Sequence, residues 1–230
     1  MPRTGVDAGN DHSSELARIA KWLHDAGFAP GTAGNVSVRS GPDRVLVTPT
    51  GCSKGTMTAK DMVEVDLCGR KLRGTREASS ELSMHMAVYN ARSDVHAVVH
   101  GHPPVATAFA CCGLALDQPI CAEIVMTLGT VPLAPYATTG TDSVGESLAQ
   151  YVVQHDAILL ANHGAVCFGR DLEDAMLKME TLEHFAQISL NVRMIGNAIP
   201  LNQVQLSELQ HAKRRYQQRT RPLCTEPLPA

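Results

Sequence analysis

Two histidines, His100 and His102, stand one residue apart in the segment VVHGHP at residues 98–103. Side chains at positions i and i+2 of an extended strand point to the same side, so the two imidazoles can reach one point in space. Two neutral imidazoles that converge in this way supply half of a tetrahedral zinc site. The spacing therefore predicts a metal site that takes further ligands from elsewhere in the chain.

His163 is the best candidate for a third ligand. It follows the apolar run at residues 156–161 and precedes Gly164, so a loop could aim its ring at the edge of a sheet. A lone histidine in such a place is more often a surface or cap residue, and an H-x-H pair also occurs in proteins without a metal. Both interpretations stay open at this point.

Ser79, Ser80 and Glu81 stand together at the start of a predicted helix. Serine hydroxyls, free N–H groups and the positive end of the helix dipole suit a phosphate, although serines cap helices more often than they bind phosphate. A metal beside an anion pocket and a carboxylate suits chemistry at a polarised oxygen next to a C–H or C–C bond. The metal would stabilise an enediolate while the carboxylate moves protons.

The elements that must position these groups follow from apolar periodicity. A helix is expected from Ser13 or Ser14 to Gly27, followed by the small-residue loop and strand GTAGNVSVR at residues 31–39. Strands are expected at 44–48, 63–67, 95–100, 131–136 and 156–161, helices at 82–92, 103–110, 142–154, from 171 past 186, and 205–218, and a loop at 69–77. Helices and strands interleave without strict βαβ alternation. The predicted fold is therefore α/β in the mixed α+β, three-layer sense, with a mostly antiparallel mixed sheet flanked by helices.

Composition narrows the class of protein. The chain has 230 residues, of which 44% are hydrophobic, and we expect a disordered leader at 1–12, one domain at 13–220 and a tail at 221–230. A net charge of -3 gives no bulk attraction to nucleic acid or to an anionic membrane. No apolar run approaches the ~20 residues needed to span a bilayer, and the start lacks an apolar signal segment. Seven scattered cysteines without a C-x-x-C pair indicate a reducing cytoplasm.

Six segments carry a family resemblance: GTAGNVSVR, VTPTG, SSE, VVHGH, APYATTGT and ANHG. In this order and at similar spacing, they resemble the class II aldolase/adducin family over roughly residues 14–190, and most closely its zinc-dependent L-fuculose-1-phosphate aldolases. The resemblance implies a mixed sheet flanked by helices and a C4 homotetramer with its active site between subunits. It also implies retro-aldol cleavage of a ketose 1-phosphate, such as L-fuculose 1-phosphate, to dihydroxyacetone phosphate and an aldehyde.

By the same resemblance, His100, His102 and His163 are the imidazole ligands of one Zn²⁺ per subunit, with Mn²⁺ or Co²⁺ possible. Glu81 matches the carboxylate that ligates the resting metal and then acts as acid and base. The residues that match the phosphate pocket of the sugar-phosphate substrate are Gly34, Asn35, Thr50, Gly51, Ser79 and Ser80.

Two departures concern the aldehyde half of the substrate. Fuculose-phosphate aldolases place a tyrosine of the neighbouring subunit at the position of Glu123, or of Ala122 if the one-residue gap is placed differently. They carry an aromatic residue at the position of Thr139. The identity of the aldehyde is therefore open.

Other members of the same fold remain alternatives. Ribulose-phosphate 4-epimerases typically carry aspartate at the position of Glu81, and 3-oxo-tetronate 4-phosphate decarboxylases tend to carry lysine at the position of Ser80. A methylthioribulose-phosphate dehydratase is a further enzymatic alternative. An adducin-like scaffold domain is the non-enzymatic alternative, and it would be expected to lack the histidines.

Overall fold

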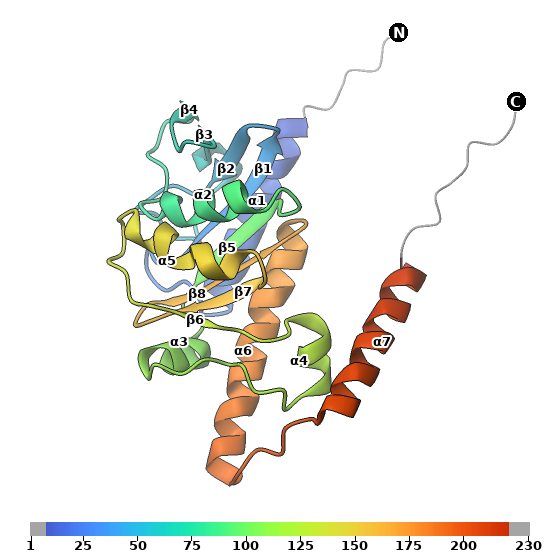
Figure 1. The fold of residues 1–230 in the computed structure, drawn as a ribbon. Helices are drawn as coiled ribbons and strands as arrows, with labels where there is room; N and C mark the ends of the chain where they lie inside the picture. The colour runs from blue at the N-terminus through green and yellow to red at the C-terminus, as the bar shows by residue number, and fades with distance from the viewer. Residues whose placement is uncertain (1–7, 221–230) are drawn as a thin grey trace, which may run out of the picture.

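The computed structural model describes residues 8–220, and eight strands of this part form one sheet. The strands lie in the order β4-β3-β2-β1-β5-β8-β7-β6, and every neighbouring pair is antiparallel except β6 and β7 (Figure 1). Their bounds are β1 Asn35–Gly41, β2 Arg44–Val47, β3 Val63–Asp66, β4 Lys71–Arg73, β5 Ala97–Gly101, β6 Leu133–Ala134, β7 Ala157–Leu160 and β8 Gly164–Gly169. The predicted mostly antiparallel mixed sheet is confirmed.

Helices cover both faces of this sheet. In Figure 1, α2 (Leu82–Ala91) and α5 (Ser143–Val152) lie in front of it, and α1 (Ala8–Asp25) and α6 (Leu172–Ile195) lie behind it. Helix α3 (Pro104–Cys111) packs on the α6 side, and the short 3₁₀ helix η1 (Ala59–Asp61) packs near α1. Helices α4 (Ala122–Thr127) and α7 (Gln203–Thr220) contact each other to one side of the sheet. The three layers match the expected architecture.

Strand β5 lies in the middle of the sheet, and the two faces of the sheet each carry an apolar core. Its side chains alternate, so Ala97 and Val99 enter the core under α1 and α6, whereas Val98 enters the core under α2 and α5. His100 is two residues from Val98 and so points to the α2 face, where the partner position on β1 is Asn35.

Several predicted boundaries differ from the structure. Helix α1 begins at Ala8, so residues 8–12 of the expected disordered leader are helical, while residues 1–7 and the tail 221–230 lie outside the described residues. The expected loop at 69–77 contains β4, which pairs with β3. Strand β8 and helix α4 were not predicted. Strand β8 is buried along its whole length, so it lacks the polar alternation by which a strand is usually detected.

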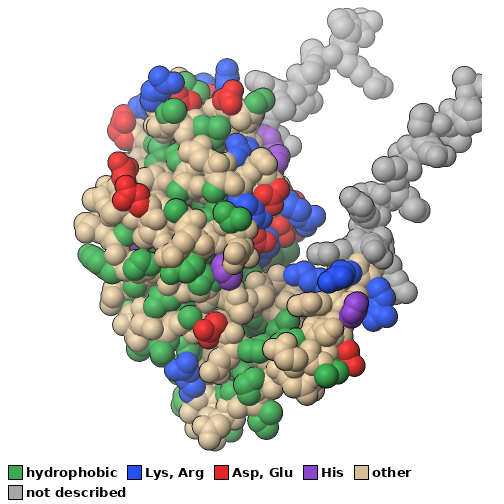
Figure 2. Space-filling model, in the orientation of Figure 1, with side chains coloured by type: hydrophobic (Ala, Val, Ile, Leu, Met, Phe, Trp, Pro, Cys, Tyr) green, Lys and Arg blue, Asp and Glu red, His purple; other side chains and the backbone are tan. Residues whose placement is uncertain are grey.

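The surface of this fold carries both signs of charge. Figure 2 shows acidic and basic side chains interspersed over one face, with Lys and Arg gathered on α7. Among the described residues, no helix is long and apolar enough to cross a membrane.

The contact between α2 and α5 depends on Gly145, because a Cβ there would lie 2.8 Å from the Ser83 carbonyl oxygen and 3.3 Å from the Ala87 Cβ. Alanine in place of a helical glycine ordinarily stabilises a protein by up to about 1 kcal/mol. Here we expect Gly145→Ala to destabilise it by about 1–3 kcal/mol through overpacking, as measured by urea unfolding. Gln150→Ala, at an exposed position of α5, should change stability by less than about 0.5 kcal/mol. A Gly145→Ala protein that is more stable than the wild type would contradict this account.

Candidate functional site

Three histidines meet at one end of the central strands. His100 lies in β5, His102 follows that strand, and His163 lies in the turn between β7 and β8. Their ligand nitrogens lie within 4.8 Å of one another, and the Nε2 atoms of His100 and His102 are 3.3 Å apart. Pairing of β5 with β8 brings the turn to this place, and the structure thus brings together the three histidines that the sequence singled out.

The turn that carries His163 needs a glycine at its end. A Cβ on Gly164 would lie 2.6 Å from both the Gly101 carbonyl oxygen and the Cδ2 atom of His102. Such a distance is far below van der Waals contact, so a larger residue would push β8 away from His102. Gly164 therefore sets how closely the third imidazole approaches the other two.

Hydrogen bonding and burial leave the imidazoles in a form that can bind a metal. His100 Nδ1 lies 2.9 Å from the carbonyl oxygen of Ala165 and donates to it, so Nε2, which faces Glu81 and the other rings, is the nitrogen left to bind a metal. Burial, with the neighbouring His100 and His163, lowers the pKa of His102 to about 4. His102 is therefore neutral at physiological pH.

Glu81 faces this cluster from the residue just before α2. Its Oε2 lies 3.2 Å from His100 Nε2, and its Oε1 lies 3.0 Å from His163 Nε2. Burial by itself raises the pKa of this carboxyl, but attraction and hydrogen bonding from His100 and His163 outweigh burial and hold the pKa well below its usual range. Asn35 Nδ2 donates to Oε2 at 2.8 Å. Glu81 is thus an ionised carboxylate inside the protein.

This donor set fits a divalent cation. The buried Oε1 of Glu81 has no hydrogen-bond donor among the described residues unless Nε2 of His163 carries a proton. The carboxylate and three imidazole nitrogens therefore face one point. Three nitrogen ligands and one carboxylate oxygen make a tetrahedral set of the type that holds zinc. His100, His102, His163 and Glu81 are the residues that would hold it.

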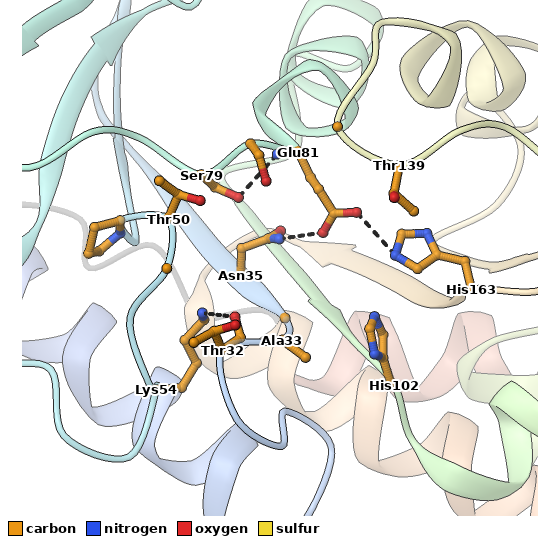
Figure 3. Close-up of a pocket in the computed structure, with 15 residues that line it drawn as sticks. Thr32, Ala33, Asn35, Thr50, Lys54, Ser79, Glu81, His102, Thr139 and His163 are labelled. Atoms are coloured by element: carbon orange, nitrogen blue, oxygen red, sulfur yellow. Dashed lines mark hydrogen bonds and ion pairs between the residues drawn. The ribbon is translucent and has the colours of Figure 1, made fainter.

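A pocket of about 510 Å³ opens beside the cluster (Figure 3). Glu81, His102 and His163 line it, while His100 is buried behind them. The remaining lining residues include all six that were matched to a phosphate pocket, and also Thr139: Gly34, Asn35, Thr50, Gly51, Ser79, Ser80 and Thr139. Glu123 is exposed on α4 and does not line the pocket of its own chain.

The end of the pocket away from the histidines is rich in donors. In Figure 3, Thr50 and Lys54 lie at one end, and His102 and His163 lie at the other. Ser79 Oγ accepts a hydrogen bond from the Glu81 N–H, which leaves its own proton for another acceptor. The phosphate group of a ligand can therefore bind at this anion end of the pocket, while the rest of the ligand faces the histidines and Glu81 at the other end.

Lys54 also lines this pocket, and sequence reasoning did not identify it. It is only 1% exposed, and its Nζ donates to the carbonyl oxygens of Thr32 at 2.8 Å and Cys52 at 2.9 Å. Within the described part of the chain it forms no ion pair, and burial lowers its pKa. In the sequence, Lys54 is a single basic residue among small residues, which does not indicate burial. Its burial becomes apparent only in the folded structure.

Replacement of one imidazole should weaken metal binding without unfolding the protein. We expect His163→Ala to reduce zinc affinity at least about 100-fold, because one of the four donors is lost. A competition titration against a chromophoric chelator measures this, with circular dichroism to check the fold. His96→Ala removes an exposed histidine beside β5 and should leave the affinity unchanged. Equal affinities of the two variants would contradict the site.

Comparison with known proteins agrees with this geometry. Residues 14–190 match the family described as "Class II Aldolase and Adducin N-terminal domain". The L-fuculose phosphate aldolase of Methanococcus maripaludis is 34% identical over 179 residues, which cover 76% of this chain and 94% of the relative. The 3-oxo-tetronate 4-phosphate decarboxylase of Pectobacterium atrosepticum is 35% identical over 179 residues, which cover 76% and 82%.

A solved L-fuculose 1-phosphate aldolase superposes with a TM-score of 0.83 at 29% identity, over 89% of this chain and 96% of that structure. The family match, the relatives and the shared fold confirm the resemblance carried by the six sequence segments. The chain belongs to the class II aldolase and adducin N-terminal domain family.

Proposed function

We propose that this protein is a metal-dependent lyase that cleaves a ketose 1-phosphate, L-fuculose 1-phosphate or a related sugar phosphate, to dihydroxyacetone phosphate and an aldehyde. One observation carries the proposal: an ionised Glu81 and three converging imidazoles open onto a pocket whose far end offers hydroxyls and a buried cation. A phosphate at that end would place the substrate's carbonyl end beside the histidines.

Each group of pocket residues has its own role in the proposed reaction. Zinc, when bound by His100, His102 and His163, supplies Lewis-acid stabilisation of negative charge on the substrate oxygens; manganese and cobalt are further candidates. A base removes the proton of the 4-hydroxyl as the bond between carbons 3 and 4 breaks and the aldehyde forms. Glu81, which reaches the same space, then exchanges a proton with carbon 3 of the three-carbon enediolate fragment. Thr50, Ser79 and Ser80 bind the phosphate with hydroxyl groups and nearby backbone N–H groups. Gly34 and Gly51, which lack a side chain, let the backbone approach it.

Two residues are proposed to contact the aldehyde half of the substrate. Thr139 lines the pocket and is proposed to contact this half. Glu123 lies on α4, outside the pocket of its own chain, so it can contribute only to the pocket of another copy. Its proposed role therefore requires the C4 homotetramer that we propose for this protein.

Decarboxylation of a 3-oxo-tetronate 4-phosphate is the second candidate. The decarboxylase from Pectobacterium atrosepticum is as similar to this chain as the aldolase from Methanococcus maripaludis. Both reactions develop negative charge on oxygens next to the bond that breaks, and both substrates carry a phosphate. The same metal and anion ends of the pocket would serve either one.

A coupled assay for dihydroxyacetone phosphate separates the two. Zinc-loaded protein with L-fuculose 1-phosphate should release it, and a chelator should stop the release. No release from zinc-loaded protein, together with carbon dioxide release from 3-oxo-tetronate 4-phosphate, would replace the aldolase by the decarboxylase.

Glu81→Gln should keep most of the zinc and lose about 10²–10⁴-fold in kcat, because the amide cannot accept the proton. Zinc content and kcat are measured on the same sample. Glu77→Gln, an exposed change in the same segment, should leave both values unchanged. Wild-type turnover by Glu81→Gln would remove the carboxylate from the mechanism.

Lys54→Met should raise KM for the phosphorylated substrate by about 10–100-fold with a smaller effect on kcat, because a buried positive charge at the anion end is lost. The unphosphorylated ketose serves as the internal reference, since a general distortion of the pocket would affect both substrates equally. Lys60→Met removes an exposed charge from the same segment and should have no effect. An equal loss with both ketoses would contradict a role in phosphate binding.

A further inference from the structure

Behind Glu81, a row of buried polar groups runs under α2 within an otherwise apolar core. His85 and Ser37 are completely buried, Tyr89 is 2% exposed and Asn35 is 3% exposed. Tyr89 OH lies 2.8 Å from Ser37 Oγ, Ser37 Oγ lies 2.6 Å from His85 Nδ1, and His85 Nε2 bonds Asn35 Oδ1. Asn35 Nδ2 then donates to Glu81 at 2.8 Å. Such groups are costly to bury unless each one finds a partner, and every link here has one.

The direction of every hydrogen bond in this row follows from its two ends. Asn35 Nδ2 donates to Oε2 of Glu81, so the Asn35 oxygen faces His85 and accepts from it. His85 Nε2 therefore carries the proton. Burial lowers the pKa of His85 to about 3, with His100 adding to the effect, so the ring is neutral and its bare Nδ1 accepts from Ser37. Ser37 in turn accepts from Tyr89.

An asparagine side chain alone does not select this orientation. The opposite amide orientation would set the Asn35 oxygen against the Glu81 carboxylate, where two acceptors repel, and would set the amide N–H groups against the Nε2–H of His85. His85 thus excludes the wrong orientation of Asn35 at one end, as Glu81 does at the other. The partner of Glu81 is fixed by a residue that does not touch Glu81.

We propose that His85 is a positioning residue which, acting through Asn35, holds the Glu81 carboxylate in the orientation that faces His100 and His163. The inference rests on the proposed function for what Glu81 does, but the orientation itself can be measured without turnover. His85 does not line the substrate pocket, and its ring is hydrogen-bonded to Ser37 and Asn35, so Asn35 is the hydrogen-bonded link between His85 and Glu81.

Two variants of His85 and one control test this role. His85→Phe keeps a ring but removes the donor to Asn35, and it should lower zinc affinity about tenfold and kcat about 10–100-fold with little change in KM. His85→Gln can offer an amide N–H where Nε2 was, and it should restore both values to within about threefold of the wild type. Tyr89→Phe removes a buried hydrogen bond from the far end of the row but leaves the Asn35 orientation in place.

The control separates positioning from simple stability. Tyr89→Phe should lower the urea midpoint about as much as a lost buried hydrogen bond does, yet change zinc affinity and kcat by less than about threefold. If His85→Phe keeps wild-type zinc affinity and kcat, or loses no more of either than Tyr89→Phe, His85 is a structural residue only and the proposal fails.

A spectroscopic readout keeps the test independent of folding defects and of turnover. The ¹⁵N chemical shifts of the wild-type imidazoles should show His85 as the neutral Nε2–H tautomer. The Nδ1–H tautomer would reverse the row and overturn the proposal. If the wild type releases no dihydroxyacetone phosphate, the aldolase proposal fails, whereas the tautomer and the zinc affinities still decide the role of His85.

Discussion

An ionised carboxylate inside a protein is the constraint on which the rest of this structure depends. Moving an ionised carboxylate from water into a protein interior costs on the order of several kcal/mol of desolvation free energy, unless the group is paired and hydrogen-bonded. Glu81 obtains its compensation from two imidazoles on one side and an asparagine amide on the other. Two of these groups are held by a further hydrogen bond: His100 by the Ala165 carbonyl and Asn35 by His85. The site is therefore a set of interdependent contacts that extends into the core.

The order of the strands makes these contacts possible. Strand β5 pairs with β1 on one side and with β8 on the other, so His100 lies opposite both Asn35 and Val166. The helix that follows Glu81 packs on the face to which these side chains point. Groups that are far apart in the chain thus share one small volume, with a pocket on its open side. The anion end of that pocket comes from the loops before β1 and after β2, and from the segment before α2.

Much of this arrangement could be predicted from residue types. The spacing of His100 and His102 on an extended segment indicates convergence, and a histidine after a buried strand is a reasonable third member. Glu81 and the serines before it are recognisable because they stand at a helix start. The alternation of short strands and helices was sufficient for the mixed sheet.

The parts that could not be predicted depend on tertiary packing. Strand β8 is apolar along its length, so its sequence does not distinguish a strand from a buried helix segment. Nothing in the sequence around Lys54 distinguishes it from a surface lysine. Only the fold shows that its ammonium group is buried and donates to two backbone carbonyls. His85 looks like any helical residue until its partners on β1 are known. Glu123 was matched by position to a site at a subunit interface, and a single chain does not place it there.

The position of β5 between β1 and β8 also affects how the chain reaches its final state. Both pairings join segments that are distant in sequence, and loop-closure entropy must be overcome before such contacts stabilise anything. The second pairing waits for residues 164–169, so during synthesis β5 has an open edge until most of the chain has left the ribosome. An unpaired apolar edge is a template for wrong strand pairing. For this protein, protection of that edge by a chaperone would matter most in the interval before β8 emerges.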